Sequence, residues 1–382
     1  MNNTPTAPPS VQRMDYIDHL RIFLTALVIC HHQAIGFGAP GGWYYIVAQP
    51  EDIFSMVTLT MFVAINQSFF MSLFFFVAAY FTPASLDKKG LSRFMRDRLI
   101  RLGIPLVVYF FLLNPTLAYI IRRFKDLVEP GYFRFMAASA LDCVGWGPLW
   151  FVLSLLIFTS VYAGVVAWRQ HIGRPLAALP RPNNRRILGF ILAIGLVTFF
   201  VRLAYPVGTE RIGLQVGYFP LYIAFFIFGI QAYRAGWLDH VEPAQTALWF
   251  RIAVALIIAL PAILILGGAL NGGGDAFSGG LTPQALVYAL WEPFLCVGIS
   301  MKLLALFRAR WSLASAFSRL LAESAYAAYI IHPFVVVLAT RLARDWPVPP
   351  MLTFLIIAPI AVASCFFIAN MIRQAPLLNK VL

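Results

Sequence analysis

The first long apolar stretch of the chain reads IDHLRIFLTALVICHH and covers residues 17–32. It has the length and apolar character of a membrane helix, yet it carries Arg21 and His32, eleven residues apart. At 3.6 residues per turn these two side chains share one helix face and are separated along the axis by roughly 16 Å. Because ionisable groups at membrane depth are costly and usually functional, this pair is the first candidate site.

Composition places the whole chain in the membrane class. Of its 382 residues, 60% are hydrophobic and only 12% are charged, whereas a soluble domain has about 25% charged residues. Apolar runs of about twenty residues, the length of a helix that crosses a bilayer, recur along the chain. The sequence therefore predicts an all-α polytopic helical bundle with about ten spans, at 16–37, 56–82, 99–121, 147–168, 187–205, 214–236, 247–270, 283–307, 321–343 and 351–372.

The distribution of basic residues predicts the orientation of the bundle. The net charge of +13 fits membrane topology better than nucleic-acid binding, because Lys and Arg collect in cytoplasmic loops. With the N-terminus inside, most of the 29 Lys and Arg residues fall in cytoplasmic segments. We therefore expect both termini in the cytoplasm, with a polar tail at 1–15, a membrane domain at 16–373 and a short tail at 374–382. Residues 1–12 lack a signal-peptide pattern, so the first span is the expected insertion signal.

The polar residues of the first span allow more than one interpretation. Asp18 and Arg21 are one turn apart and can pair, although Arg21 could equally extend to the lipid headgroups. His32 lies deeper and could either hydrogen-bond a neighbouring helix or act as a base. His31 points about 100° away from His32, and no third ligand is near, so no metal site is predicted. The cysteines at positions 30, 143, 296 and 365 are expected to be small buried apolar residues.

A second cluster lies at the predicted cytoplasmic entry to the third span. It contains four arginines, Arg93, Arg96, Arg98 and Arg101. Ordinary positive-inside loop charge would explain any one of them. As a group they also suit an anion site, because the planar guanidinium binds phosphate oxygens in a bidentate manner.

Further polar side chains lie in the last third of the chain and in one early loop. Tyr326, Tyr329 and His332 are spaced by three and form one ridge of a helix, which suits either interhelical hydrogen bonds or a site. Glu292 lies inside the eighth span and needs an arginine or histidine partner there, in a structural ion pair or in a catalytic role. The loop at 41–45, with the sequence GGWYY, is expected at the outer membrane interface.

Four motifs follow one another along about 15–335. They are Asp-x-x-Arg with a His eleven residues after the Arg, an arginine-rich entry to the third span, Leu-Trp-Phe at the start of the fourth, and Tyr-x-x-Tyr-x-x-His-Pro near the end. The residues are Asp18, Arg21 and His32; Arg96, Arg98, Arg101 and Pro105; Leu149, Trp150 and Phe151; and Tyr326, Tyr329, His332 and Pro333. In this order they resemble the acyltransferase-3 family of integral membrane acyltransferases, in its stand-alone form. The chain departs from that family at Ala78 and Ala79, where Ser-Gly is usual.

The resemblance implies transfer of an acyl group, expected to be acetyl, from cytoplasmic acyl-CoA to a hydroxyl of a carbohydrate-like acceptor. It implies a multi-pass protein of a bacterial-type inner membrane that needs no metal. The four arginines of the second cluster would bind the CoA phosphates. Substrate contacts or structural bonds would come from Asp18, Trp150, Tyr326, Tyr329 and His332.

For the reaction itself, the expected catalytic residues are His32, Arg21 and Glu292. His32 would act as general base, and burial favours the neutral imidazole that this role requires. Arg21 would steady the thioester or add to the phosphate site, and Glu292 would orient the histidine. A covalent acyl-histidine is an open alternative. A second class of function, a proton-coupled transporter of a small solute, is also open, although the chain lacks the internal repeat typical of many transporters.

Overall fold

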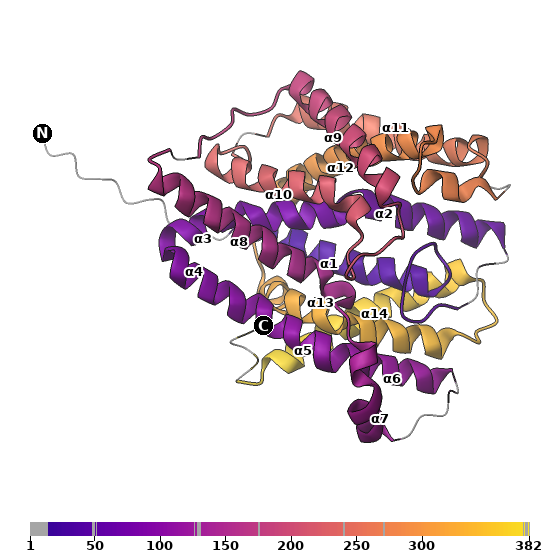
Figure 1. Cartoon of the computed structure of the whole chain (residues 1–382). Coiled ribbons are helices and arrows are strands. Elements are labelled where there is room, and N and C mark those ends of the chain that lie inside the picture. Colours follow the sequence, from indigo (N-terminus) through magenta and orange to yellow (C-terminus); the bar gives the residue numbers. More distant parts are fainter. Residues whose placement is uncertain are drawn as a thin grey trace, which may run out of the picture.

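The computed structural model describes residues 14–47, 50, 52–125, 127, 131–174, 176–239, 241–269, 272–376, 378 and 381. Within these ranges the chain is helical, apart from loops and one isolated bridge between Arg211 and Leu214. The long helices run back and forth through one bundle (Figure 1). The predicted all-α bundle is therefore confirmed. The predicted N-terminal tail lies almost entirely outside the described residues.

Most of the predicted spans correspond to one long helix each. These are α1 (Asp15–Gly36), α2 (Ile53–Tyr80), α8 (Trp150–His171), α9 (Asn184–Ala204), α10 (Phe219–Arg234), α11 (Pro243–Leu266), α12 (Pro283–Arg310), α13 (Ala316–Ala343) and α14 (Pro350–Arg373). Shorter helices are α3 (Thr82–Lys89), α4 (Leu91–Arg98), α5 (Ile104–Val108), α6 (Asn114–Phe124) and α7 (Tyr132–Ser139). In the described part of the chain, nine helical stretches are long and apolar enough to cross a membrane.

The first predicted span, 16–37, corresponds to α1, which is not among these nine stretches because it is more polar. It carries Asp15, Asp18 and Arg21 near its start and His31 and His32 near its end. It packs against α2, α12, α13 and α14, so it lies inside the bundle. A helix surrounded by protein can carry polar groups because its neighbours, and not lipid, receive them.

The third predicted span is one helical stretch interrupted by two wide π-helical turns. These turns are η1 (Leu99–Gly103), between α4 and α5, and η2 (Tyr109–Leu113), between α5 and α6. Pro105 and Pro115 follow them closely. Because proline cannot donate the usual backbone hydrogen bond, the preceding turn widens. The arginine cluster lies at the start of this stretch, in α4 and η1.

The two ends of the bundle differ in chemistry. We call the histidine end the one where α1 ends at Gly36 and α2 begins at Ile53. We call the arginine end the opposite one, where α3 meets α4 at Gly90. The loops that connect α1 to α2, α9 to α10 and α11 to α12 all lie at the histidine end, because successive long helices alternate in direction (Figure 1).

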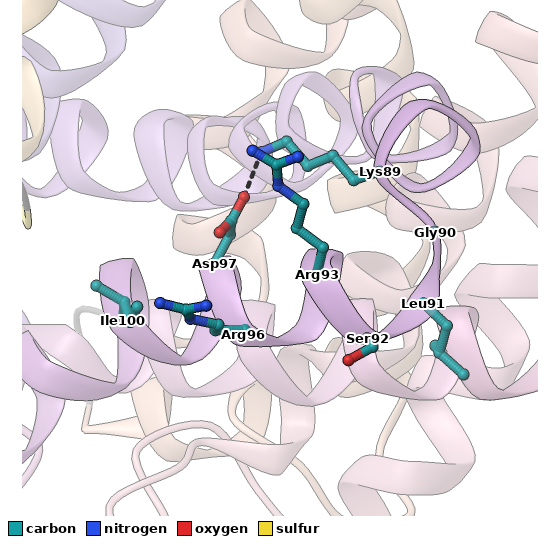
Figure 2. A pocket seen from close by; sticks show the side chains of 8 residues that line it. All are labelled: Lys89, Gly90, Leu91, Ser92, Arg93, Arg96, Asp97 and Ile100. Atoms are coloured by element: carbon teal, nitrogen blue, oxygen red, sulfur yellow. Dashed lines mark hydrogen bonds and ion pairs between the residues drawn. The ribbon is translucent and has the colours of Figure 1, made fainter.

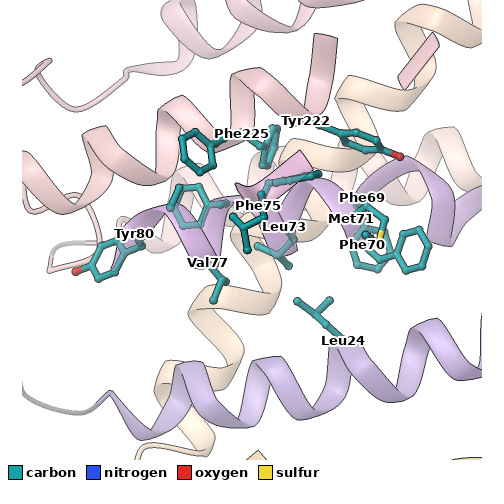
Figure 3. Packing of buried hydrophobic residues seen from close by; sticks show 14 of the residues in the cluster. Leu24, Phe69, Phe70, Met71, Leu73, Phe75, Val77, Tyr80, Tyr222 and Phe225 are labelled. Atoms are coloured by element: carbon teal, nitrogen blue, oxygen red, sulfur yellow. The ribbon is translucent and has the colours of Figure 1, made fainter. Parts of the chain in front are cut away.

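Close packing of α2 against α10 forms the centre of the hydrophobic core. Figure 3 shows Phe75 of α2 on the side of Phe225 and Tyr222 of α10, whereas Val77 points away from α10, toward the helix α1 that carries Leu24. The two helices approach closely at Gly229, where an added Cβ would lie 2.3 Å from the Phe76 carbonyl oxygen. Small residues allow such close approach between membrane helices, where packing rather than water exclusion drives association.

Candidate active site at the histidine end

A cavity of about 1200 Å³ opens among the loops of the histidine end. Its wall combines the end of α1, the middle of α2, the segment 144–150 that leads into α8, and the loops that follow α1, α9 and η7 (Gly273–Phe277). The described wall residues include no lysine and no arginine, and the one carboxylate among them is that of Glu210. Aromatic rings are abundant in this wall. Pockets of this size, mostly apolar with a few polar groups, are the usual sites for small ligands.

His32 lies in the cavity wall and forms a hydrogen bond with a histidine 300 residues away. Its Nδ1 lies 2.9 Å from Nε2 of His332 on α13. The His332 Nδ1 donates in turn to the backbone carbonyl of Tyr329. A neutral His332 that donates from Nδ1 must accept at Nε2, so His32 donates from Nδ1 and keeps an unprotonated Nε2. Among the described residues none hydrogen-bonds this Nε2, so it is the available acceptor.

The loop after α1 folds inward over this histidine pair. The Trp43 ring stacks on the His32 ring, with 3.9 Å between centroids and 12° between planes. The Tyr44 hydroxyl lies 3.0 Å from that of Tyr109 and donates to Asn114 Oδ1, which fixes the loop to the third span. Burial raises the pKa of Tyr44 to about 12, so its hydroxyl stays protonated. Trp43 and Tyr44 of the loop at 41–45, for which the sequence predicted only a position at the outer interface, thus also line the cavity.

Stacked aromatic rings form another part of the wall. Tyr222 of α10 stacks on Trp150, with centroids 5.5 Å apart, and on Tyr218, with centroids 6.2 Å apart. Gln67 of α2 donates to the Tyr222 hydroxyl at 3.0 Å. All four side chains line the cavity. Trp150, selected from its sequence motif, is thus a wall residue, whereas Tyr218, Tyr222 and Gln67 had no motif that pointed to them.

The three side chains of the predicted α13 ridge all form hydrogen bonds with other parts of the chain. Tyr326 donates to the Arg101 carbonyl at 3.0 Å, Tyr329 donates to the Pro148 carbonyl, and His332 meets His32. Tyr326 and His332 are six residues apart, which is roughly 9 Å along the helix. The backbone of the arginine-rich segment therefore contacts α13 at Tyr326, which is less than two helical turns from the histidine pair.

Arg21 and Asp18 lie at the other end of α1. Arg21 Nη1 is 3.4 Å from Asp18 Oδ1, and the guanidinium is partly exposed. Neither Arg21 nor Asp18 is among the described residues that line the large cavity. The predicted ion pair is confirmed, and the structure separates it from His32 along the helix.

The four arginines of the second cluster occupy two faces of their helix. Arg93 and Arg96 line a pocket of about 680 Å³ at the arginine end, together with Lys89 and Asp97, which pair at 2.6 Å (Figure 2). Arg98 instead lies over the Phe94 ring. Neither Arg98 nor Arg101 is among the residues that line this pocket. The structure thus divides the predicted phosphate site into a pocket and a second basic face.

Glu292 has the arginine partner that its depth required, and that partner is Arg202. Glu292 Oε2 lies 2.6 Å from Arg202 Nη2, and both side chains are almost fully buried. No hydrogen bond joins Glu292 to His32 in the described structure; the orienting contact on His32 comes from His332. Arg202 was not among the residues selected from the sequence. A usable signal existed, because Arg202 falls within the predicted span 187–205.

The described residues contain no group of three or more potential metal ligands close enough to hold an ion. His31 lies in the cavity wall beside Phe70, with ring centroids 4.8 Å apart. Cys296 and Cys365 are buried as expected, while Cys30 and Cys143 are only partly so.

Comparison with known proteins identifies the family. The family model described as an acyltransferase domain matches residues 14–370. The chain therefore belongs to the acyltransferase-3 family and is an integral, multi-pass membrane protein. The assignment favours the enzyme over the transporter that the sequence left open.

Curated relatives are bacterial proteins of glucan biosynthesis. The chain is 25% identical over 228 residues to glucans biosynthesis protein C of Salmonella schwarzengrund (strain CVM19633). This match covers 57% of this chain and 58% of that protein. The same values hold for the proteins of Salmonella heidelberg (strain SL476) and Salmonella agona (strain SL483). The match thus spans less than two thirds of these relatives' length. No solved structure matches the chain significantly.

Proposed function

We propose that this acyltransferase moves an acyl group, with acetyl as the first candidate, from acyl-CoA to a hydroxyl of a carbohydrate-like acceptor in the cavity. The observation that carries the proposal is the hydrogen-bonded row of His32, His332 and the Tyr329 carbonyl at the cavity wall. It has the arrangement of a general base held by a second group, which is the form that acyl transfer commonly uses.

The proposed reaction begins with proton removal. Nε2 of His32 takes the proton of the acceptor hydroxyl as its oxygen attacks the thioester carbonyl carbon. The carbon–sulfur bond then breaks, and the imidazolium returns the proton to the departing CoA thiolate. His332 holds the His32 ring and fixes its tautomer throughout. An acyl-histidine intermediate is the alternative, in which Nε2 attacks the thioester before the acceptor arrives.

The acceptor is proposed to bind by ring stacking and neutral hydrogen bonds. Trp150 and Tyr222 offer flat apolar faces, and Gln67 and Tyr44 offer polar groups at the edges. Since the described wall contains no lysine or arginine, the part of the acceptor that enters is expected to be uncharged. The name of the Salmonella relatives, which refers to glucans, agrees with a sugar acceptor.

The donor is proposed to approach from the arginine end. Lys89, Arg93 and Arg96 form an open basic pocket there, and CoA carries several phosphate charges. Arg98 and Arg101 lie on the other face of the same segment. The Arg101 backbone contacts α13 at Tyr326, on the arginine-end side of the histidine pair. Arg21 and Asp18 also lie at this end of the bundle. On this proposal the arginine end and both termini face the cytoplasm, and the protein lies in a bacterial inner membrane.

The test uses purified protein reconstituted in nanodiscs. It is incubated with acetyl-CoA or succinyl-CoA and with glucose oligosaccharides, and the products are analysed by mass spectrometry. We expect the oligosaccharide mass to increase by one acyl group for one of the donors, with release of free CoA. Loss of donor without any acylated sugar would reject the acceptor class, and no consumption of either donor would reject the proposed reaction.

A further inference from the structure

Arg202, at the last turn of α9, is a fully buried guanidinium surrounded by parts of the cavity wall. Its Nη2 pairs with Glu292 at 2.6 Å, and its Nε donates to the Gly217 carbonyl at 3.1 Å. The guanidinium also lies between two tyrosine rings, 5.0 Å from the Tyr218 centroid and 5.4 Å from the Tyr288 centroid. Both tyrosines line the cavity, whereas Arg202 and Glu292 lie behind them.

The same residue fixes two loops of the histidine end. Gly280 donates its backbone N–H to the Arg202 carbonyl at 3.4 Å, and a Cβ on Gly279 would lie only 2.5 Å from that oxygen. Val207 donates to the Ser278 carbonyl at 2.7 Å, which joins these loops directly. The loop from 205 to 218 and the loop before α12 are therefore assembled around Arg202.

The tyrosine that stacks on Arg202 begins the row of rings in the wall. Tyr218 stacks on Tyr222, and Tyr222 stacks on Trp150. A displacement of Tyr218 would therefore be transmitted to the rings on which the acceptor is proposed to lie. This step rests on the proposed function, because it takes the cavity as the acceptor site.

We propose that the Arg202–Glu292 ion pair is a positioning device that sets the tyrosine wall of the acceptor cavity. A buried ion pair is weak grounds for a stabilising role, because apolar residues of similar volume often replace both partners without loss of stability. Its contacts with Tyr218, Tyr288 and Gly217 instead give it a geometric role in acceptor binding. Glu292 acts through Arg202 and is not a catalytic residue in this account.

The test compares single and double replacements. R202M and E292M each leave one buried charge unpaired and are expected to fold poorly. R202M/E292M removes both charges and is expected to fold, as judged by gel filtration and thermal unfolding. R202K keeps a charge opposite Glu292 but loses the planar group that stacks between the tyrosines. R234M is the matched control, because Arg234 binds Tyr162 at 2.6 Å at the arginine end.

In the reconstituted assay with acyl-CoA and glucose oligosaccharides, we expect the double variant and R202K to raise the acceptor KM about tenfold, which corresponds to about 1.4 kcal/mol. The KM for acyl-CoA should stay unchanged, and R234M should match the parent protein. A folded double variant with the parent acceptor KM would overturn the proposal. Should the double variant fail to fold, an unchanged acceptor KM in R202K would overturn it.

A second measurement does not depend on turnover. Gln215 lies in the cavity wall on the loop that Arg202 fixes, so a Q215C protein can be labelled with a water-soluble maleimide. We expect labelling to be several-fold faster when R202K is added to Q215C, because the loop loses its anchor. Equal labelling rates would overturn the positioning role, whether or not the parent protein transfers acyl groups. A parent protein without acyl transfer would reject the proposed function, and it would leave the labelling test in place.

Discussion

The close contact at Gly229 provides a quantitative test of the bundle that holds the site. In a G229A protein the new methyl would lie 2.3 Å from the Phe76 oxygen and 2.8 Å from the Ala79 Cβ. Normal contacts between such atoms are about 3.5–4.0 Å, so α2 and α10 must separate by about 1 Å. Overpacking of this kind costs about 1–3 kcal/mol. The shift would also move Tyr222 of α10 relative to Gln67 of α2.

G164A provides the matched control for this prediction. Gly164 lies inside α8, and an added Cβ there would have no neighbour within 4 Å. Both variants gain about 1 kcal/mol of helix propensity, so the difference between them isolates the clash. We expect G229A to be less stable than G164A by about 1–3 kcal/mol, measured by denaturant unfolding of purified protein in mixed micelles. Equal stability of the two variants would refute the packing of α2 on α10 described above.

Three further predictions concern the site. Y44F removes two hydrogen bonds that hold the inward loop, worth about 1 kcal/mol each, and should lower kcat about tenfold. In the parent protein the pKa of Tyr44, about 12, exceeds the ordinary value of 10. The contribution of Tyr44 to stability should therefore persist below pH 10 and decline as the pH rises to about 12. H332F should lower kcat about tenfold, with little change in the KM for acyl-CoA, since one hydrogen bond to the base is lost; an unchanged kcat would remove His332 from the mechanism. R93Q and R96Q should raise the KM for acetyl-CoA by about tenfold or more, because each removes a charge-assisted bond to phosphate. The KM for acetyl-pantetheine, which lacks the CoA phosphates, should stay unchanged in both variants.

The helices of the fold could be predicted because apolar run length alone defines them. A span needs about twenty apolar residues, and the predicted 283–307 and 351–372 lie within α12 and α14. The wide turns of the third span could not be placed in this way. They depend on how the helix closes around Pro105 and Pro115, which the run of apolar residues does not record.

The candidate site was only partly predictable, because its pairs are distant in sequence. His32 and His332 were each selected, but their contact depends on how α1 packs on α13. Glu292 was expected to have a basic partner, yet nothing in its neighbourhood indicated Arg202. Trp43 was assigned to the interface from its residue type, since aromatic residues prefer that depth. Only the fold of its loop brings it over the histidine.

The most direct test of the central claim is acyl transfer by an H32A protein. Loss of a general base lowers the rate by about 10²–10⁴-fold. We expect reconstituted H32A to fold and insert normally but to add no acyl group to glucose oligosaccharides within the time in which the parent protein completes the reaction. H19A is the control, because His19 hydrogen-bonds the Asp15 carbonyl at the other end of the same helix. Acylation by H32A at the rate of H19A would contradict the account.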